Sequence, residues 1–272
     1  MIKPISNKGI AERLVAAKET ARNAGTLALD YFARYQTLDI DYKTSRQDAV
    51  TIADQAVETH IRNAIFSVFP EDGIIGEEHG VVPGSSGYDW IIDPIDGTAA
   101  FLHGLSSWSV VIALLENGKP VAGLVYEACA DRLYWAEAGG GAYCNENRLV
   151  IPPTAFDAGL TVIAASRPEH ADHTGSIIAQ LLKQGGAFMR SGSAALALAH
   201  VGAGHYVGFY EPRLSAWDCL AGLLIVSEAG GDCDDWLALG AISNRHPCLA
   251  GNKVVAPILR TIIAKAPGIN GA

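Results

Sequence analysis

The sequence has few cysteines, and their spacing is not that of a cross-linked or zinc-binding protein. The five are widely separated and no two form a C-x-x-C pair: Cys129, Cys144, Cys219, Cys233 and Cys248. An odd number at such spacing argues against a disulfide framework and a zinc ribbon, and it is typical of the reducing cytosol. We therefore predict a cytoplasmic protein.

An excess of positive charge is also missing. The chain has 20 lysines and arginines against 29 aspartates and glutamates, a formal net charge of −9. Nucleic-acid binding by phosphate neutralisation favours the opposite sign, and so does binding to an anionic membrane surface. We therefore expect neither a nucleic acid nor a membrane as a partner.

Targeting segments and long apolar runs are absent as well. Residues 1–20 carry scattered charges and no apolar stretch of the signal-peptide kind. Two windows, 97–115 and 191–210, lack Asp, Glu, Lys and Arg, but both contain His and several Ser or Gly. Neither window predicts a membrane span.

The chain does contain enough apolar residues to form a sizeable core. Hydrophobic residues make up 49% of its 272 residues, which rules out a disordered protein. Apolar spacing predicts two helices, 8–35 and 51–69, followed by strand-rich segments at 73–78, 88–93, 107–128 and 131–143. The pairs Asn117-Gly118 and Ala130-Asp131 separate β-rich segments, as hairpin turns do.

After residue 148 the pattern changes. Pro152-Pro153 interrupts the chain, 161–166 has the composition of a buried strand, and helices are expected at 173–184, 194–201, 216–228 and 254–265. We predict two domains with a boundary near 149: an α+β domain at 1–148 with an antiparallel sheet, and an α/β domain at 149–272.

The most informative motif is WIIDPIDGT, residues 90–98. A strand is expected to end on Asp93, and Asp96 lies just before Gly97-Thr98, where a helix or tight turn can begin. Such a turn can direct both carboxylates to one point beside backbone N–H groups that suit a phosphate. A strand exit with Asp96 as a helix cap explains the same residues.

Three further acids can each be explained either by a structural role or by a role in a functional site. Glu77, beside Glu78, follows a short apolar strand, where acids are commonly solvated. Asp54 and Asp218 each stand three residues after a hydroxyl residue, Thr51 and Ser215, which is capping-box spacing. Each acid alone is explained by structure, but their joint occurrence favours a site.

Together these motifs resemble the inositol monophosphatase family. The resemblance rests on 48–58, GEE at 76–78, DPIDGT at 93–98, WD at 217–218 and the EAGG that follows, and it covers nearly the whole chain. It implies a layered αβαβα fold and a magnesium-dependent, lithium-sensitive phosphomonoesterase, commonly a homodimer. The apolar stretch 108–135 is expected to supply either a dimer face or internal core.

The resemblance also assigns roles. Glu77, Asp93 and the carbonyl of Ile95 are expected to bind one Mg²⁺, and Asp93, Asp96 and Asp218 a second, so that two or three ions are expected in all. Asp54 and Thr98, with Glu77, match the group that activates the attacking water. The remaining expectations are phosphate contacts from Asp96, Gly97 and Thr98, and a basic residue near the site, Lys43.

The physics of the residues agrees with this assignment. Two carboxylates about 4 Å apart repel by roughly 4 kcal/mol at an effective dielectric of about 20. A cluster of carboxylates therefore needs cations, and oxygen ligands without His or Cys suit Mg²⁺ rather than zinc.

Substrate choice stays open in the sequence. Ala100 departs from the residues that inositol-phosphate and nucleotide-phosphate members carry at that position. Glu211 and the segment Gly192-Ser193-Ala194 match the pocket of polyol-phosphate members, although Glu211 before Pro212 also fits a surface turn. Histidinol phosphate, fructose 1,6-bisphosphate and adenosine 3′,5′-bisphosphate are alternative substrates, and a regulatory binding protein that keeps the fold is an alternative function.

Overall fold

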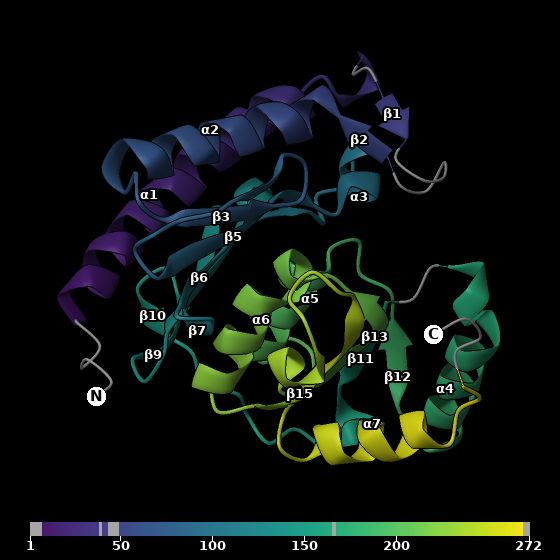
Figure 1. The fold of residues 1–272 in the computed structure, drawn as a ribbon. Coiled ribbons are helices and arrows are strands. Elements are labelled where there is room, and N and C mark those ends of the chain that lie inside the picture. Colours follow the sequence, from purple (N-terminus) through teal and green to yellow (C-terminus); the bar gives the residue numbers. More distant parts are fainter. Residues whose placement is uncertain (1–6, 38–39, 43–48, 165–166, 269–272) are drawn as a thin grey trace.

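The structure, a computed structural model, describes all residues except 1–6, 38–39, 43–48, 165–166 and 269–272. It stacks five layers, helices alternating with two sheets (Figure 1). The first layer pairs α1 (Asn7–Phe32) with α2 (Ile52–Val68), and beside them lies a small hairpin of β1 (Ile40–Tyr42) and β2 (Ala49–Thr51). The predicted αβαβα sandwich is confirmed.

The larger sheet has eight strands in the order β10-β9-β8-β7-β6-β5-β3-β4. Their bounds are β3 (Gly73–Gly76), β4 (Gly80–Val82), β5 (Tyr88–Asp96), β6 (Ser109–Glu116), β7 (Lys119–Glu127), β8 (Arg132–Glu137), β9 (Gly141–Cys144) and β10 (Asn147–Arg148). The sheet is antiparallel except that β3 runs parallel to β5, and β4 pairs antiparallel with β3 at the edge.

Two predicted hairpin connections lie in this sheet. Asn117 and Gly118 both have positive φ, 50° and 78°, which the tight turn between β6 and β7 requires. Asp131, at φ 48°, closes the link from β7 to β8. Both turns therefore stand where the sequence predicted them.

The second sheet has five strands in the order β12-β11-β13-β15-β14. It is mixed: β11 runs parallel to β12 and β13, whereas β15 is antiparallel to β13 and β14. The bounds are β11 (Leu160–Ile163), β12 (Ala187–Met189), β13 (Gly208–Leu214), β14 (Asp232–Cys233) and β15 (His246–Gly251).

Two helix pairs cover this second sheet. Between the two sheets lie α5 (Ala194–Gly202) and α6 (Ala216–Glu228), and on the outer face lie α4 (Ala171–Lys183) and α7 (Val255–Ala264) (Figure 1). Short 3₁₀ helices stand in the connections, at Tyr35–Thr37, Ala128–Ala130, Phe156–Ala158, Pro168–His170 and Trp236–Leu239.

Three buried clusters fill the spaces between the layers. One face of β5 and β6, including Trp90 and Ile112, packs on α1 and α2, whereas the opposite face, including Ile91 and Val111, packs on α5 and α6. A third cluster joins the outer face of the small sheet to α4 and α7. Successive residues of a strand point to opposite faces of the sheet, so alternate residues of β5 and β6 pack into two different cores.

Most element ends lie within two residues of the sequence prediction, and those of the first helix and of two strands are instructive. The first helix ends at Phe32 and does not continue to Tyr35. Tyr35 lies in a 3₁₀ turn, and its ring stacks on that of Phe32 with the centroids 6.0 Å apart. The strand expected at 73–78 ends at Gly76, and the one expected to end on Asp93 continues to Asp96.

The apolar stretch 108–135 is mainly internal. Residues 110–115 of β6 are at most 2% exposed, because β5 and β7 flank this strand and helices cover both faces. Of the two expectations for the stretch, internal core is therefore the correct one for β6. The expected boundary near 149 falls between β10 and β11, and the division into two domains stays a prediction.

Candidate active site

The DPIDGT motif places two carboxylates at the end of β5. Pairing between β5 and β6 is irregular between Asp93 and Asp96, and the Ile95 N–H donates to Asp93 Oδ1 at 3.0 Å. Gly97 then adopts φ 98°, and α3 (Thr98–Leu102) begins. A Cβ on Gly97 would lie 2.9 Å from the Ser107 carbonyl oxygen, so there is also no room for a side chain at position 97.

Asp96 is held by the opposite half of the molecule. Its carboxylate accepts hydrogen bonds from the Ser193 hydroxyl, from the Ala194 N–H at 3.3 Å and from the Ala195 N–H at 2.7 Å, all at the start of α5. The carboxylate therefore fixes the first turn of α5 against the end of β5. The segment predicted to line the substrate pocket is thus brought to a predicted metal ligand.

Asp54 caps α2 and also contacts the DPIDGT segment. Its Oδ2 accepts from the Thr51 N–H at 2.8 Å and the Thr51 hydroxyl at 2.6 Å, which completes the capping box of α2. Its Oδ1 faces the site and accepts from the Thr98 hydroxyl at 3.2 Å. That hydroxyl also lies 3.1 Å from the Ile95 carbonyl oxygen. The side chain that caps α2 therefore also borders the candidate site.

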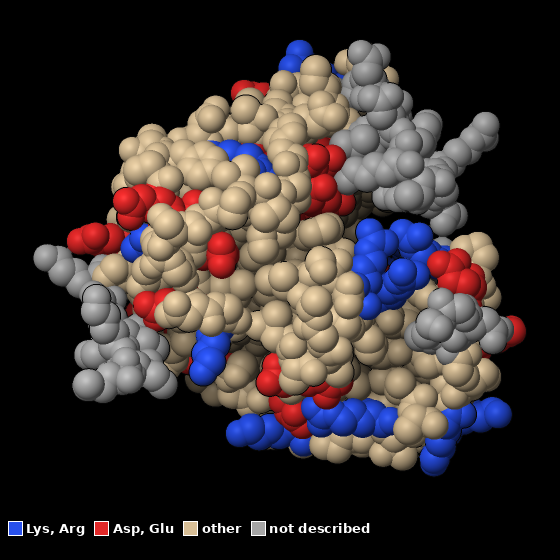
Figure 2. Space-filling model, in the orientation of Figure 1, with Lys and Arg blue, Asp and Glu red and all other residues tan. Residues whose placement is uncertain are grey.

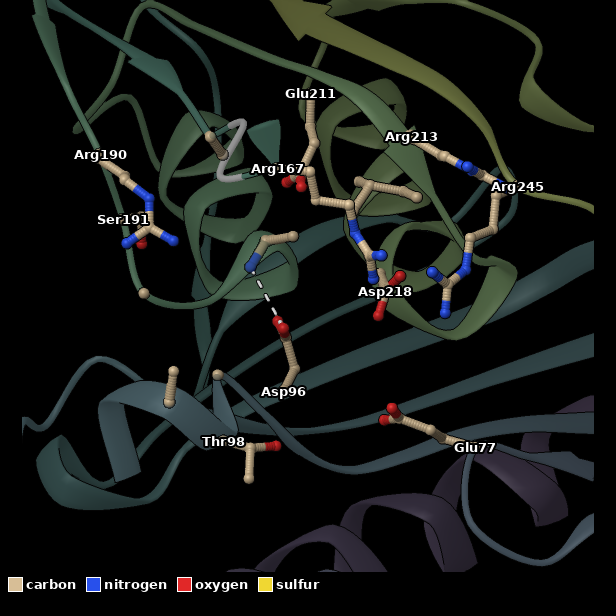
Figure 3. Close-up of a pocket in the computed structure, with 16 residues that line it drawn as sticks. Glu77, Asp96, Thr98, Arg167, Arg190, Ser191, Glu211, Arg213, Asp218 and Arg245 are labelled. Carbon is tan, nitrogen blue, oxygen red and sulfur yellow. Dashed lines mark hydrogen bonds between the residues drawn. The ribbon is translucent and has the colours of Figure 1, made fainter. Parts of the chain in front are cut away.

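Asp218 enters from the first turn of α6. One of its oxygens accepts from the Ser215 N–H at 2.7 Å, so the cap is present, and the Ser215 hydroxyl accepts from Arg245 Nε at 3.1 Å. Carboxylate oxygens of Asp93, Asp96 and Asp218 lie within 4.8 Å of one another, and Glu77 faces the same space (Figure 3).

Burial and mutual repulsion make this cluster unstable in its charged form. Burial, followed by the charges of Glu77, Asp96 and Asp218, raises the pKa of Asp93 well above its usual value. Burial likewise raises the pKa of Asp54 and of Asp96 to about 6 each, although their hydrogen bonds oppose the shift. A divalent cation among these oxygens offsets the repulsion, so this donor set fits Mg²⁺.

Glu77, Asp96 and Asp218 border a pocket of about 220 Å³ whose other side is basic, and Asp93 lies beside them. We call Glu77, Asp93, Asp96 and Asp218 the acidic wall. The arginine wall consists of the four arginines that line the pocket: Arg167, Arg190, Arg213 and Arg245. Figure 3 shows their side chains on segments of the second half, and Figure 2 shows basic side chains gathered on this face, right of centre.

The sequence did not single out the arginine wall. Its members come from four separate segments: the residue before the 3₁₀ helix at Pro168–His170, the residue after β12, strand β13, and the residue before β15. No motif spacing links them, and the tertiary structure alone brings them together. The one basic residue that was predicted, Lys43, lies outside the described residues.

Glu211 lies in the pocket, on β13 just before an irregular stretch of pairing with β15. Burial, with the charges of Asp218 and Asp96, raises the pKa of Glu211 well above its usual value, while Arg190 and Arg167 act in the opposite direction. The side chain therefore lines the pocket, as one of its two sequence interpretations required.

Comparison with known proteins gives a consistent result. The sequence profile of the inositol monophosphatase family matches residues 10–265. The chain belongs to the inositol monophosphatase family. Membership makes it a phosphoric monoester hydrolase, and the predicted resemblance is confirmed.

Among the relatives, the inositol-1-monophosphatase of Mesorhizobium japonicum is 37% identical over 252 residues, 91% of this chain and 94% of that protein. The Thermotoga maritima protein named fructose-1,6-bisphosphatase/inositol-1-monophosphatase is 35% identical, over 83% of this chain and 85% of its own length. Among solved structures, the suhB protein of Bartonella henselae has a TM-score of 0.88 at 31% identity, covering 93% of this chain and 99% of its own.

Proposed function

We propose that this enzyme is a Mg²⁺-dependent phosphomonoesterase that hydrolyses inositol monophosphate or a similar small polyol phosphate by direct attack of water. The observation that carries the proposal is the convergence of Asp93, Asp96 and Asp218 within 4.8 Å, beside the pair formed by Asp54 and Thr98. These groups come from β5, α6, α2 and α3, and a purely structural role for each would not require them to meet.

In this proposal Glu77, Asp93 and the Ile95 carbonyl hold one Mg²⁺, and Asp93, Asp96 and Asp218 hold a second. Bound Mg²⁺ lowers the pKa of water and stabilises the charge that develops on the phosphate and the leaving oxygen. The chain's other groups position the reactants, with the Gly97-Thr98 backbone at the phosphate and Glu211 at the polyol.

Proton handling falls to Thr98 and Asp54. The Thr98 hydroxyl, 3.2 Å from Asp54 Oδ1, can accept a hydrogen bond from a water while it donates to that carboxylate. This fixes the orientation of the water, and Glu77 opposite completes the group. No side chain is needed as a covalent nucleophile.

The relatives' names give competing functions. One from Chlorobaculum parvum, 34% identical, is named a histidinol-phosphatase, and one from Xylella fastidiosa, 34% identical, is named Nus factor SuhB. A phosphate-release screen compares the candidate substrates in one experiment. The panel contains inositol 1-phosphate, histidinol phosphate, fructose 1,6-bisphosphate and adenosine 3′,5′-bisphosphate, each with and without Mg²⁺.

We expect Mg²⁺-dependent release with inositol 1-phosphate well above histidinol phosphate, and inhibition by lithium. Release that is equal with and without Mg²⁺ contradicts the metal assignment. No release from any ester, with a folded protein, favours the regulatory alternative.

Location and assembly are part of the same proposal. No helix among the described residues is long and apolar enough to cross a bilayer, and we propose a cytoplasmic homodimer. Light scattering at micromolar concentration tests the assembly, and a monomer would contradict it.

A further inference from the structure

The turn that carries Glu77 is hydrogen-bonded to a side chain of α2. This turn joins β3 to β4, and its first N–H, that of Glu77, donates to the Ile92 carbonyl of β5 at 3.2 Å. The next two N–H groups, of Glu78 and His79, donate instead to the Glu58 carboxylate, at 2.7 and 3.1 Å. Glu58 thus accepts the hydrogen bonds of a turn whose backbone would otherwise need other acceptors.

Glu58 is an unusual acceptor for this purpose because it is a fully buried acid. Its exposed fraction is 0%, and Asp54 lies one turn earlier on the same helix. A buried carboxylate is unfavourable unless it is paired and hydrogen-bonded. Arg62, one turn later, pairs with it: Nε donates to Glu58 Oε1 at 2.7 Å, and the guanidinium also donates to the Gly80 carbonyl at the start of β4. The pair therefore bonds to the turn through both its N–H groups and its carbonyl.

Gly76 shows how closely the Glu58–Arg62 pair fits the turn. A Cβ at Gly76 would lie 2.1 Å from a Glu58 oxygen and 2.7 Å from an Arg62 nitrogen, distances that real Cβ atoms do not reach. The residues before and after Glu77 are thus both in contact with the pair. The backbone on either side of Glu77 has little room to move while the pair is intact.

The His79 ring adds a further contact between the turn and α2. Its Nε2 lies 3.0 Å from the Thr59 hydroxyl and 3.2 Å from the Gln55 carbonyl oxygen. The same helix carries Asp54 at its first turn, and α2 lies along β3 and β5 (Figure 1). One helix therefore holds the turn and Asp54 in a fixed relation to each other.

The position of Glu77 matters to the other acids. Burial raises the pKa of Asp93 and of Asp218 well above the usual value, and in both cases the charge of Glu77 adds most after burial. Glu77 also lines the pocket, whereas neither Glu58 nor Arg62 does. A metal ligand whose orientation is fixed by hydrogen bonds around it binds its ion more tightly than one that must first be ordered.

We infer that Glu58 and Arg62 are positioning residues that set the Mg²⁺ affinity of one ion site by fixing the turn that carries Glu77. The inference rests on the proposed function, in which Glu77, Asp93 and the Ile95 carbonyl hold that ion. Because neither member of the pair lines the pocket, both act through the backbone of the turn.

An effect of charge through space is the competing explanation. The negative charge of Glu58 attracts a nearby cation and the positive charge of Arg62 repels it, whatever the geometry of the turn. Removing the first charge should then weaken Mg²⁺ binding, and removing the second should strengthen it. Positioning predicts the same sign for both changes, since loss of either partner releases the turn.

Calorimetric titration of the chelated enzyme with Mg²⁺ separates the two explanations. Glu58→Gln should raise the Kd of the Glu77 site about tenfold, because an amide has one acceptor oxygen and both carboxylate oxygens are in use. Arg62→Gln should raise the same Kd several-fold, against the direction that charge predicts. Arg62→Lys, which keeps the charge but loses the forked contact, should raise it less. The ion held by Asp93, Asp96 and Asp218 should keep its Kd.

The matched control is the second buried acid–arginine pair, Asp72 with Arg13 at 2.7 Å. Asp72 also accepts from Trp90 Nε1 at 2.9 Å and the Ser86 hydroxyl at 2.7 Å, and it does not line the pocket. It precedes β3, the strand that leads to Glu77. Asp72→Asn should lower Tm without changing either Mg²⁺ Kd.

The outcomes separate this inference from the proposed function. An unmodified enzyme that binds no Mg²⁺ would remove both. If it does bind Mg²⁺, an unchanged Kd in Glu58→Gln and Arg62→Gln, with lowered Tm, would give the pair a structural role only. Weaker binding in the first variant with tighter binding in the second would assign the effect to charge, and an equal rise of Kd in Asp72→Asn would assign it to general loss of stability. If Glu58→Gln does not fold, the two Arg62 variants decide by the same signs.

Discussion

The two walls of the pocket are built in opposite ways. On the acidic wall, carboxylates are fixed by hydrogen bonds from neighbouring elements: Asp96 by the start of α5 and Asp218 by the Ser215 N–H. On the arginine wall, Arg190 and Arg213 are exposed side chains without ion pairs in the described chain. This difference is the one expected if the acidic wall carries the chemistry, which needs fixed geometry, and the arginine wall carries recognition, which tolerates longer and more adaptable side chains.

The difference has an electrostatic side as well. The pKa of Asp93 and of Asp218 is raised, chiefly by burial, so the acidic wall resists ionisation until a cation binds. Arginine stays protonated at any ordinary pH, so the opposite wall keeps its charge regardless of metal. Metal binding should therefore change one wall and leave the other unaltered.

The largest effect is expected at Asp93, the proposed bridge between two ions. Asp93→Asn should nearly abolish turnover, because one charge is lost from two metal sites at once. The metal-free variant should melt at the same or a higher temperature than the parent, because repulsion within the cluster falls. Asp89→Asn, four residues earlier on the same strand, is the control that should keep its activity. Near-normal turnover by folded Asp93→Asn would contradict the metal assignment.

The next effects concern the two acids that also cap helices. Asn is a comparable cap, so Asp54→Asn and Asp218→Asn should each cost well under ~1 kcal/mol of stability. Turnover should nevertheless fall by orders of magnitude if Asp218 binds metal and Asp54 orients the attacking water. Melting curves and kinetics on the same two proteins test this, and retained activity would reduce both residues to caps.

A smaller effect is expected at Glu211, which lies between the walls. Glu211→Gln should lower kcat/KM for a polyol phosphate by about ten- to a hundredfold, since a charge-assisted hydrogen bond contributes roughly 1.5 to 3 kcal/mol. Para-nitrophenyl phosphate, which has no ring hydroxyls, should be hydrolysed about as well as before. Equal losses on both substrates would assign Glu211 to the catalytic centre instead.

The smallest effect concerns the pH dependence of stability. The folded pKa values of Asp54 and Asp96, about 6, lie above the ordinary value of 3.8. Groups with a raised folded pKa stabilise the fold at low pH, and that contribution is lost as pH rises through about 6. After chelation, Tm should therefore be lower at pH 8 than at pH 5.5, and added Mg²⁺ should raise Tm more at pH 8. Equal Mg²⁺ effects at both pH values would contradict this account.

Much of the acidic wall was predictable because its residues stand at local structural boundaries. Asp93 and Asp96 lie at the end of the apolar strand β5, and Asp218 has capping-box spacing after Ser215, as Asp54 beside the acidic wall has after Thr51. Each motif determines its own strand end or helix start through neighbours within a few residues. Family resemblance then linked the four motifs into one site.

Sequence spacing did not reveal how far these strands extend or how the halves meet. The strand that was expected to end on Asp93 continues to Asp96, because β6 pairs with it beyond the irregularity. Asp96 was predicted as a ligand, but its hydrogen bonds to α5 depend on residues nearly a hundred positions later. Such contacts come from the packing of layers, which no local pattern encodes.

The sequence by itself determined the six longer helices, strands β3, β5 to β9 and β11, the hairpin turn at Asn117-Gly118 and the identity of the acids, because each depends on local backbone preference and apolar period. Only the tertiary structure decided the arginine wall and the pairing of Glu58 with the turn that carries Glu77. Those groups lie on segments that are distant in sequence and carry no shared spacing. They meet because the two sheets and the helices between them bury their apolar faces together.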